Sequence, residues 1–296
     1  MTGDYVLSCE STVDLTPLQL ARRDIAYIGY PFQLNGRTYR DDLGQTLSYA
    51  DFYAALAAGA ETATMQINAF EYAEYFEPFL RAGRDVLHLC LSSGITGTIN
   101  SAMLARENLL EQYPDRKIIL VDSLAASSGF GLLMDRLADL RDAGMTMEDL
   151  ARWAEENKRR VHHWFFSTDL TFYIKGGRIS KTAGTVGSVL GICPLMNVSA
   201  EGKLVPREKI RSKRRVIRAA VDRMEQYAEA GLRYTGKCYI SHSACRSDAL
   251  QLAGLVEERF PLLRERPAIY DIGTTIGCHS GPGTAALFFW GSPRAD

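Results

Sequence analysis

Residues 89–98 combine the residue types and spacing that most strongly suggest chemistry. Ser92 and Ser93 follow a short apolar run, Gly94 comes next, and the residues from Thr98 onward have a helical pattern. Free N–H groups and the dipole at a helix start attract anions, and serine hydroxyls add donors. The segment has no lysine or arginine and matches neither G-x-x-x-x-G-K-[ST] nor G-x-G-x-x-G. It therefore predicts either an anion site that is not a Walker loop, or a capped turn without a ligand.

His279 is the second candidate, because it lies in the glycine- and proline-rich run 276–284. Such residues impose an unusual backbone, so the run predicts a rigid loop around the histidine. A single histidine is more often structural than functional. A well-positioned imidazole can nevertheless donate to an anion, and both interpretations stay open here.

Two further segments place polar residues beside predicted elements. Residues 63–68 precede a helical pattern. Within this segment, Asn68 is an ordinary N-cap, and Thr64 is expected to point towards the strand ends. Residues 175–180 contain two consecutive glycines and predict a tight turn that presents Arg178. Neither segment assigns a function by itself.

Alternating strands and helices must position these segments in the first half of the chain. Apolar runs predict buried strands at 5–7, 25–30, 85–91 and 118–122. Helical patterns lie at 51–58 after the N-cap Ser48, and at 69–81, 98–112, 130–143 and 147–160. Residues 31–40, with Asn35-Gly36 at the centre, predict a β-hairpin inserted after the second strand. This alternation predicts an α/β/α domain with a parallel sheet over residues 1–160.

The second half, residues 161–296, predicts a different domain. Strands are expected at 161–168, 193–198, 203–205, 237–241, 268–271 and 285–289, with helices at 211–230 and 247–260. Short turns between several of these strands favour antiparallel pairs. The fold class is therefore α/β, with a parallel-sheet domain followed by a two-layer, mixed-sheet domain.

Composition excludes several classes of function for the 296-residue chain. Its 34 basic and 35 acidic residues leave a formal net charge of -1, so no attraction to nucleic acid is expected. No apolar run has the length of a bilayer-spanning helix, and the first residues lack the features of a signal peptide, so we expect a cytoplasmic protein without stable membrane insertion. The 6 cysteines form no C-x-x-C pair, which predicts buried free thiols and no metal site.

Six ordered segments of the chain resemble the DegV family of bacterial fatty-acid-binding proteins, and together they cover almost all of it. They are the four described above, residues 121–123, and residues 10–15, where the family usually reads D-S-x-x-D-L. Glu10 stands where the family has aspartate. Met65 stands where the family motif T-S-Q-[PI]-[SN] has its serine, which removes a hydroxyl and adds apolar volume. The head-group network or the preferred acyl chain is therefore expected to differ here.

The resemblance implies one fatty acid of the palmitate, stearate or oleate class, buried between the two domains. Its carboxylate would be held without a cation, near the C-terminal histidine loop at the interface. The residues carried over as carboxylate-binding are Thr64, Ser92, Ser93, Gly94 and His279, with Ser11, Asp122, Arg178 and Gly281 nearby or supporting. No cofactor and no metal are implied.

The resemblance also implies a carrier for phospholipid metabolism, which presents the fatty acid to a separate ATP-dependent kinase subunit that forms acyl-phosphate. The chain has no visible nucleotide site, so it is not expected to be an enzyme by itself. Its basic cluster Lys209, Arg211, Lys213, Arg214 and Arg215 is either a solvated helix face or a docking site for the kinase subunit.

Two alternatives remain. Ser93, His279 and Asp122 have the residue types of an acyl- or phosphoryl-transfer triad or a hydrolase, although G-x-S-x-G is missing. By fold analogy alone, the chain could also be a sugar- or ketone-binding subunit similar to those of dihydroxyacetone kinases.

Overall fold

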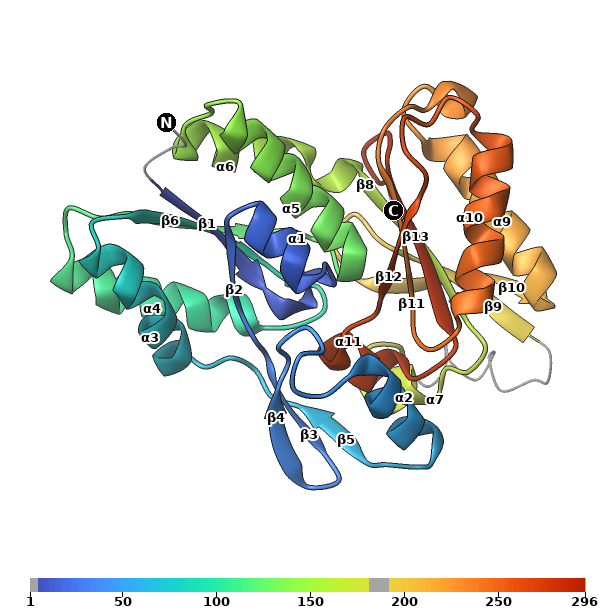
Figure 1. Ribbon diagram of the computed structural model, residues 1–296, viewed down its shortest axis with the longest axis horizontal. Helices are drawn as coiled ribbons and strands as arrows, with labels where there is room; N and C mark the ends of the chain where they lie inside the picture. Colours follow the sequence, from blue (N-terminus) through green and yellow to red (C-terminus); the bar gives the residue numbers. More distant parts are fainter. Residues whose placement is uncertain (1–4, 181–191, 296) are drawn as a thin grey trace.

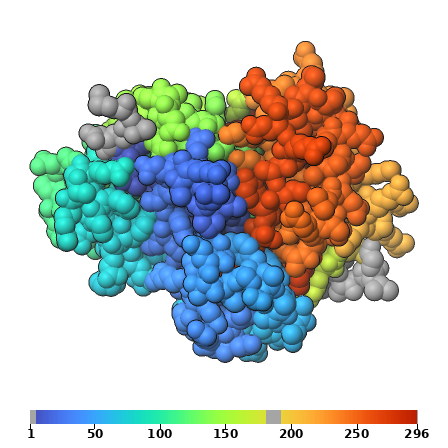
Figure 2. Space-filling model, viewed as in Figure 1, coloured from blue at the N-terminus to red at the C-terminus, as the bar shows by residue number. Residues whose placement is uncertain are grey.

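The computed structural model describes residues 5–180 and 192–295 of the chain. Two large sheets with their helices lie side by side, and a small third sheet lies below them in the view of Figure 1. The space-filling view (Figure 2) shows the two halves pressed together, with the segment of the third sheet as a lobe beneath them. The fold is α/β, with a parallel-sheet domain and a mixed-sheet domain, as the sequence predicts.

The first sheet is parallel and has the strand order β2-β1-β6-β7. Alternate residues of β1 enter different cores, Leu7 and Cys9 on one face and Val6 on the other. Both faces are covered by helices, which explains the continuous apolar runs of these strands. The elements of this part are β1 (Tyr5–Glu10), η1 (Ser11–Val13), α1 (Pro17–Arg22), β2 (Ile25–Ile28), α3 (Ala69–Arg81), β6 (Asp85–Cys90), α4 (Thr98–Gln112), β7 (Ile118–Asp122), α5 (Ser127–Asp142), α6 (Met147–Asn157) and η2 (Lys158–Arg160).

The second sheet has six strands in the order β10-β9-β8-β13-β11-β12, and only β11 and β12 pair in parallel. Helices α9 and α10 cover one face through an apolar cluster that includes Val216, Leu252 and Leu287. The elements are β8 (Val161–Ser167), α7 (Thr171–Lys175), β9 (Ile192–Val198), β10 (Leu204–Arg211), α9 (Lys213–Tyr227), η3 (Gly231–Arg233), β11 (Cys238–His242), α10 (Arg246–Arg259), β12 (Ala268–Asp271), α11 (Thr274–Ser280) and β13 (Thr284–Trp290).

Helix α5 lies between the two large sheets (Figure 1). Its residues Phe130 and Leu133 are fully buried, in a core that also contains Leu7 of β1, Phe165 of β8 and Phe288 of β13. A helix that is apolar on several sides is typical of a fully buried position. This single helix therefore joins the two halves into one continuous core.

The third sheet pairs β4 (Arg37–Arg40), β3 (Pro31–Leu34) and β5 (Thr62–Thr64) in that order. Asn35 and Gly36 both have positive φ, at 50° and 76°, as a two-residue hairpin turn of this kind requires. Helix α2 (Tyr49–Ala57) packs on this sheet. Helix α11, from the C-terminal part of the chain, packs against α2, because Cys278 lies in the same apolar cluster as Phe52.

Several short elements differ from the sequence-based expectations. The run around His279 is not a loop: residues 274–280 form helix α11, and the chain leaves the helix only at Gly281. Strand β5 and helix α7 are also unforeseen, because three to five residues are too few for a periodic pattern. Arg211 ends strand β10 and does not begin the following helix, whose first residue is Lys213.

The cysteines are free and largely buried, as the sequence predicts. All six cysteines are free thiols, and each is buried except Cys245, which is half-buried. Within residues 5–180 and 192–295, no helix combines the length and apolar character needed to cross a membrane.

Candidate functional site

The centre of the site is the pair Thr64 and His279, which lie 215 positions apart in the sequence and in contact in the structure. Thr64 is the last residue of β5, and His279 lies in the last turn of α11. Thr64 Oγ1 is 2.8 Å from His279 Nε2. The other ring nitrogen, Nδ1, is buried without a hydrogen-bond partner among the described residues. A Cβ at Gly176 would overlap this Nδ1, so only glycine lets the backbone approach the ring so closely.

His279 is uncharged at neutral pH. Burial disfavours the imidazolium and lowers its pKa to about 4, and the nearby positive charge of Arg178 acts in the same direction. A neutral imidazole has one donor and one acceptor nitrogen. His279 Nε2 and the Thr64 hydroxyl hydrogen-bond to each other, and either can instead bond to the oxygen of an incoming ligand.

A cavity of about 70 Å³ adjoins this pair and is lined by both halves of the chain. Its polar lining residues include Arg178 and His279. Its apolar walls come from β8, β9, β10, β13 and α11 and from residues near the first sheet: Ile95, Ala126, Phe165, Val198, Leu204, Ile276, Ala286 and Phe288. For comparison, an apolar cavity of about 150 Å³ holds one benzene molecule. A long acyl chain would therefore require the lining side chains to move apart.

His163 and Ser127 also line the cavity and were not foreseen from the sequence. The backbone N–H of Ala126 donates to His163 Nε2 at 3.3 Å, and His163 Nδ1 lies 3.1 Å from the carbonyl of Val161. Burial holds the pKa of His163 well below its usual range. His163 is therefore a neutral, fully engaged wall residue, and its position in an apolar strand gave no signal of this role.

The turn after β6 places Ser92 and Gly94 against the second half of the chain. Ser92 Oγ donates to the carbonyl of Gly202 at 2.8 Å and accepts from the Gly94 N–H at 3.1 Å. A Cβ at Gly94 would lie 2.6 Å from the carbonyl of Glu201, so the contact requires glycine. The Ser92 hydroxyl thus already serves the contact with Gly202, and the Gly94 amide is used within the turn. The Ser93 hydroxyl is exposed and makes no hydrogen bond within residues 5–180 and 192–295.

The predicted supporting residues have separate roles. Ser11 is buried, and its Oγ accepts from the Tyr30 N–H at 3.2 Å. Gly281 has φ of 62° directly after α11 and packs on Phe172. Arg178 Nη1 donates to the carbonyl of Gly176 at 2.6 Å, whereas its buried Nε has no partner within the described ranges. Arg178 therefore lies at the cavity beside His279, and the site has a cation next to it.

Met65 is not among the residues that line this cavity. Its side chain is 38% exposed, while its backbone N–H continues the pairing of β5 with the carbonyl of Pro31. Because successive residues of an extended segment point in opposite directions, Met65 points away when Thr64 faces His279. The side chain at position 65 therefore belongs to the surface beside the site.

Ser93, His279 and Asp122 do not form a Ser–His–Asp relay in the described structure. Asp122 Oδ1 accepts from the backbone N–H groups of Ser93 and Leu124, at 3.1 and 3.0 Å. His279 instead pairs with Thr64. A relay requires the histidine to contact both the nucleophile and the carboxylate. Asp122 therefore stabilises the two turns at the ends of β6 and β7.

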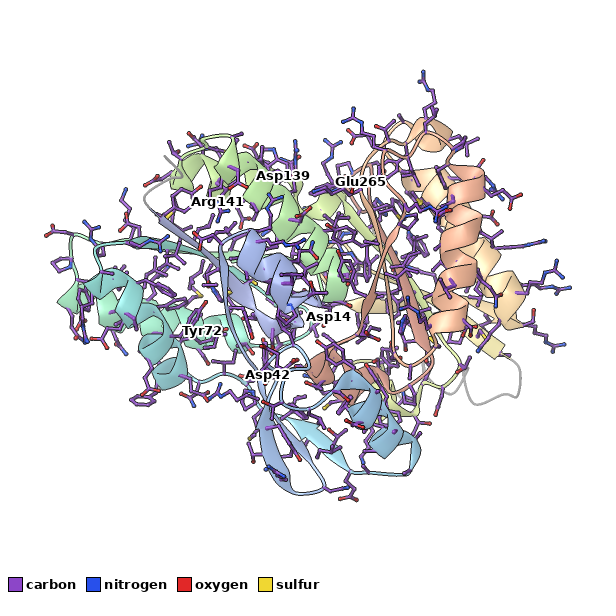
Figure 3. The ribbon with its side chains drawn as sticks, viewed as in Figure 1. Asp14, Asp42, Tyr72, Asp139, Arg141 and Glu265 are labelled. Atoms are coloured by element: carbon purple, nitrogen blue, oxygen red, sulfur yellow. The ribbon has the colours of Figure 1, made fainter. Side chains whose placement is uncertain are left out.

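Glu10 anchors the neighbouring strand ends. Its carboxylate accepts from the Tyr30 hydroxyl at 3.1 Å, from the Leu91 N–H at 2.7 Å and from the Tyr72 hydroxyl. Figure 3 shows Tyr72 on α3, on the side of the first sheet. The extra methylene relative to aspartate gives this carboxylate its reach to Leu91, the residue before Ser92.

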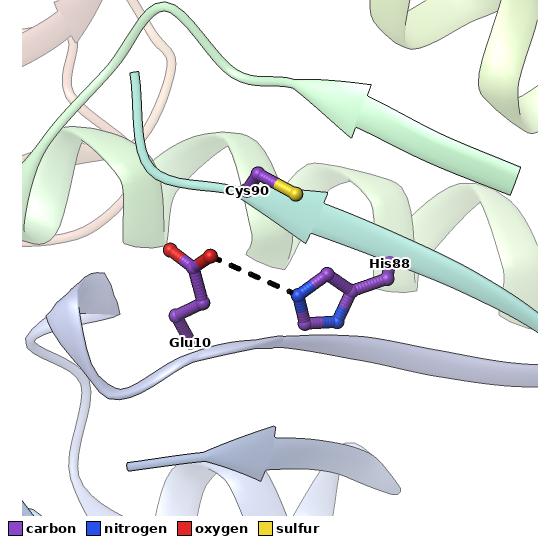
Figure 4. Close-up of side chains that lie close together, drawn as sticks. All are labelled: Glu10, His88 and Cys90. Atoms are coloured by element: carbon purple, nitrogen blue, oxygen red, sulfur yellow. Dashed lines mark ion pairs between the residues drawn. The ribbon is translucent and has the colours of Figure 1, made fainter. Parts of the chain in front are cut away.

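Glu10, His88 and Cys90 are also the one described group of three residues whose ligand atoms lie within 4.8 Å of one another, as metal ligands would (Figure 4). His88 Nε2 is 4.0 Å from Glu10 Oε1. All three residues are fully buried, and the three donors named above already occupy the carboxylate. The arrangement fits a structural polar cluster that joins β1 and β6.

The basic cluster lies on the surface of the second half. Arg214 and Arg215 are exposed in the first turn of α9, and Arg211 and Lys209 are exposed on β10. Lys213 Nζ is 2.7 Å from Asp248 Oδ2, so this lysine is paired. Leu204, at the other end of β10, lines the cavity, and seven residues of strand span roughly 23 Å. Arg211 therefore lies roughly 23 Å along β10 from the cavity wall at Leu204.

The sequence matches a known protein family over almost its whole length. Residues 7–291 match the model of the DegV family, described as uncharacterised proteins. A DegV domain-containing protein of Clostridium perfringens is 34% identical over 291 residues, which is 98% of each chain. One of Lactococcus lactis is 31% identical over 289 residues, or 96% of each. The chain belongs to the DegV family.

Solved structures share its fold. A DegV family protein of Thermus thermophilus, described by its fatty acid binding, superposes with a TM-score of 0.85 at 24% identity, covering 97% of this chain and 99% of that one. The fatty acid kinase B3 protein of Streptococcus pneumoniae, loaded with linoleic acid, gives 0.83 at 22% identity, covering 98% and 99%.

Proposed function

We propose that this protein binds one long-chain fatty acid in the cavity between its two halves and presents the carboxylate to a separate ATP-dependent fatty-acid kinase subunit. Thr64, His279 and the Ser93 hydroxyl would hold the carboxylate. Ser92 and Gly94 would shape the turn that carries Ser93. The ligand class is palmitate, stearate or oleate; structural relatives carry the long-chain heptadecanoic, linoleic and stearic acids.

The observation that carries this proposal is the Thr64–His279 pair beside an apolar cavity. Burying more than ten methylenes contributes about 0.8 kcal/mol each, or roughly 8 kcal/mol in all. Hydrogen bonds to a charged group contribute about 1.5–3 kcal/mol each, which offsets part of the cost of desolvating the carboxylate. The acyl chain thus supplies most of the affinity, and the polar pair fixes which end faces outward.

Surface position supports presentation to a partner. Thr64 and His279 are each only half-buried, and Met65, which follows Thr64, is exposed. Ser93, on the turn after β6, is exposed as well. A kinase subunit must reach the carboxylate oxygen to transfer phosphate to it, and a head group at this depth satisfies that need. The exposed Arg211, Arg214 and Arg215 would add a second, electrostatic contact with the partner.

Lipid extraction tests the binding step. Purified protein is denatured and extracted with organic solvent, and mass spectrometry should find close to one fatty acid per chain. Ala286→Leu, which fills the cavity wall, should reduce this content strongly, whereas Ala54→Leu on the exposed face of α2 should not. A clean extract, combined with no thermal stabilisation by added palmitate or oleate, would refute the proposal.

A reconstituted reaction tests presentation. With the ATP-binding kinase subunit and labelled ATP, the loaded protein should support acyl-phosphate formation. Charge reversal at Arg214 and Arg215 should slow this reaction without changing the lipid content. An unchanged rate would remove the docking role of the basic cluster and leave the binding proposal standing.

A further inference from the structure

The short helix α11, which presents His279, begins without a capping side chain of its own. Its N-cap is Gly273, and no side chain of that residue can accept from the first N–H groups. Two carboxylates from the first half accept instead. Asp14 Oδ1 accepts from the Gly273 N–H at 2.9 Å, and Asp41 Oδ2 accepts from the Thr275 N–H at 3.0 Å. A helix end needs such acceptors, and carboxylates there also interact favourably with the helix dipole.

The Asp41 carboxylate has a second contact with the same helix. The hydroxyl of Thr275 donates to Asp41 Oδ2 at 2.6 Å, and the Leu43 N–H donates to Oδ1 at 3.3 Å. Asp14 is fixed from its own side, because the Ser127 hydroxyl donates to Oδ2 at 2.5 Å. Figure 3 shows Asp14 where the two halves meet. Each carboxylate therefore joins α11 to a loop of the first half.

The rest of α11 is seated on the first half with little free space. The Tyr53 hydroxyl donates to the carbonyl of Ile272 at 2.8 Å, and a Cβ at Gly277 would lie 2.6 Å from that hydroxyl. Thr62 Oγ1 lies 2.7 Å from Cys278 Sγ. The helix has seven residues, too few to be stable alone, so these contacts and the two carboxylates set its position.

We propose that Asp14 and Asp41 are positioning residues for the head-group histidine. By holding the first turn of α11, they set the depth and orientation of His279 in its last turn and keep Nε2 against Thr64. Neither carboxylate touches the cavity. Their role in fatty-acid binding rests on the function proposed above, whereas their effect on His279 can be measured without any ligand.

Hydrogen bonds, which oppose the effect of burial, explain why two acidic residues can be retained here. Asp14 and Asp41 are 2% and 1% exposed, and burial raises the pKa of both carboxyls. The hydrogen bonds from Ser127 and Thr275 act in the opposite direction and favour the charged forms. Replacing either residue by alanine leaves buried N–H groups unpaired, which the helix can avoid only by moving.

The test monitors the imidazole of His279 by NMR in protein labelled at its 5 histidines, with His279→Gln identifying the signal. In wild-type protein the pKa of His279 should be about 4. In Asp41→Ala the ring should become hydrated and titrate nearer to its ordinary range, and fatty-acid affinity should fall by about tenfold or more. Asp41→Asn keeps an acceptor oxygen and should restore most of both properties.

Asp42→Asn is the matched control, since Asp42 accepts from the Gln45 and Thr46 N–H groups and contacts no part of α11 among the described residues. If Asp41→Ala does not fold, Thr275→Ala removes only the hydroxyl donor and should give a smaller change in the same direction, as should Asp14→Asn. Asp41→Ala and Thr275→Ala with wild-type titration and affinity within about twofold would overturn the assignment. Failure of wild-type protein to bind fatty acid would refute the proposed function, while the titration would still decide the positioning role.

Discussion

Fatty-acid binding should be coupled to proton uptake through His279. The pKa of this histidine is about 4 because burial and Arg178 disfavour the charged ring. A carboxylate bound at Nε2 would bring a negative charge into contact with it. The perturbation to apply is therefore pH, lowered from 8 towards 6, in wild-type protein and in His279→Gln.

The size of the effect depends on the distance and the environment. Two opposite unit charges about 4 Å apart near a protein surface interact by about 4 kcal/mol. Because one pKa unit corresponds to about 1.4 kcal/mol, this attraction is large enough to move the pKa of His279 into the neutral range in the complex. Since the complex binds the proton more tightly than the free protein does, affinity should rise as pH falls through the pKa of the complex. The gain should end where the free fatty acid, an ordinary carboxylic acid, or the free protein, with its His279 pKa of about 4, is itself protonated.

Calorimetry in two buffers of different ionisation enthalpy measures this coupling directly. At pH 6 to 7, the binding enthalpy of oleate should depend on the buffer, with a net uptake approaching one proton per fatty acid. His279→Gln keeps a hydrogen-bond donor at this position but cannot titrate, so its binding enthalpy should not depend on the buffer. Thr64→Ser, which keeps the hydroxyl, serves as the control that leaves proton uptake intact.

Equal uptake in wild-type protein and in His279→Gln would refute the reasoning, because the proton would then come from another group. Zero uptake in wild-type protein with normal affinity would refute it as well. That outcome would mean that the neutral ring donates from Nε2 and never becomes charged, in spite of a carboxylate in contact with it.

Three further predictions concern single side chains. Thr64→Val keeps the shape but removes the hydroxyl beside His279 Nε2, so fatty-acid affinity should fall by about 5- to 10-fold with little change in melting temperature, measured by ligand titration and thermal unfolding. Gly176→Ala places a methyl group against His279 Nδ1, so it should displace the ring. The loss in the free energy of fatty-acid binding should exceed the loss in the free energy of unfolding, measured by urea titration. Phe130→Ala empties the centre of α5 between the two sheets and should lower the free energy of unfolding by about 3–5 kcal/mol; a loss below about 1 kcal/mol would contradict the shared core.

Strands and long helices were predictable because their local patterns repeat over many residues. The apolar runs of β1, β6 and β7 and the helix from Ala69 to Arg81 form as expected, and Asn68 caps that helix with Glu71 completing a capping box. The short elements were not predictable. Helix α11 contains one glycine within its seven residues and is flanked by Gly273 and Gly281, a pattern typical of a loop, and it becomes a helix because the first half supplies its caps.

The site was predictable in its residue types and not in its contacts. Thr64 and His279 were singled out from the sequence. Their pairing depends on helix α11 packing against strand β5 of the third sheet, and no local sequence pattern predicts that contact. Asp14 lies in the family-like segment 10–15, but neither it nor Asp41 was predicted to hold helix α11, because no local pattern shows which distant N–H groups a loop aspartate accepts from. Met65 was expected to alter the cavity because sequence position does not reveal which way an extended residue points.

Head-group geometry and acyl-chain space depend on different parts of the chain. Helix α11 belongs to the second half in sequence, but its position is set by contacts with the first half through Asp14, Asp41 and Tyr53. The cavity walls instead come largely from the second sheet, where Phe165 and Phe288 face α5. Helix α11 itself also lines the cavity, at positions that include Ile276 and His279. Substitution of Phe165 or Phe288, which belong to the second sheet, is therefore expected to change the preferred chain length without moving the Thr64–His279 pair. In the proposed function, such wall positions would let the carboxylate site stay constant for the partner while the accepted acyl chain varies.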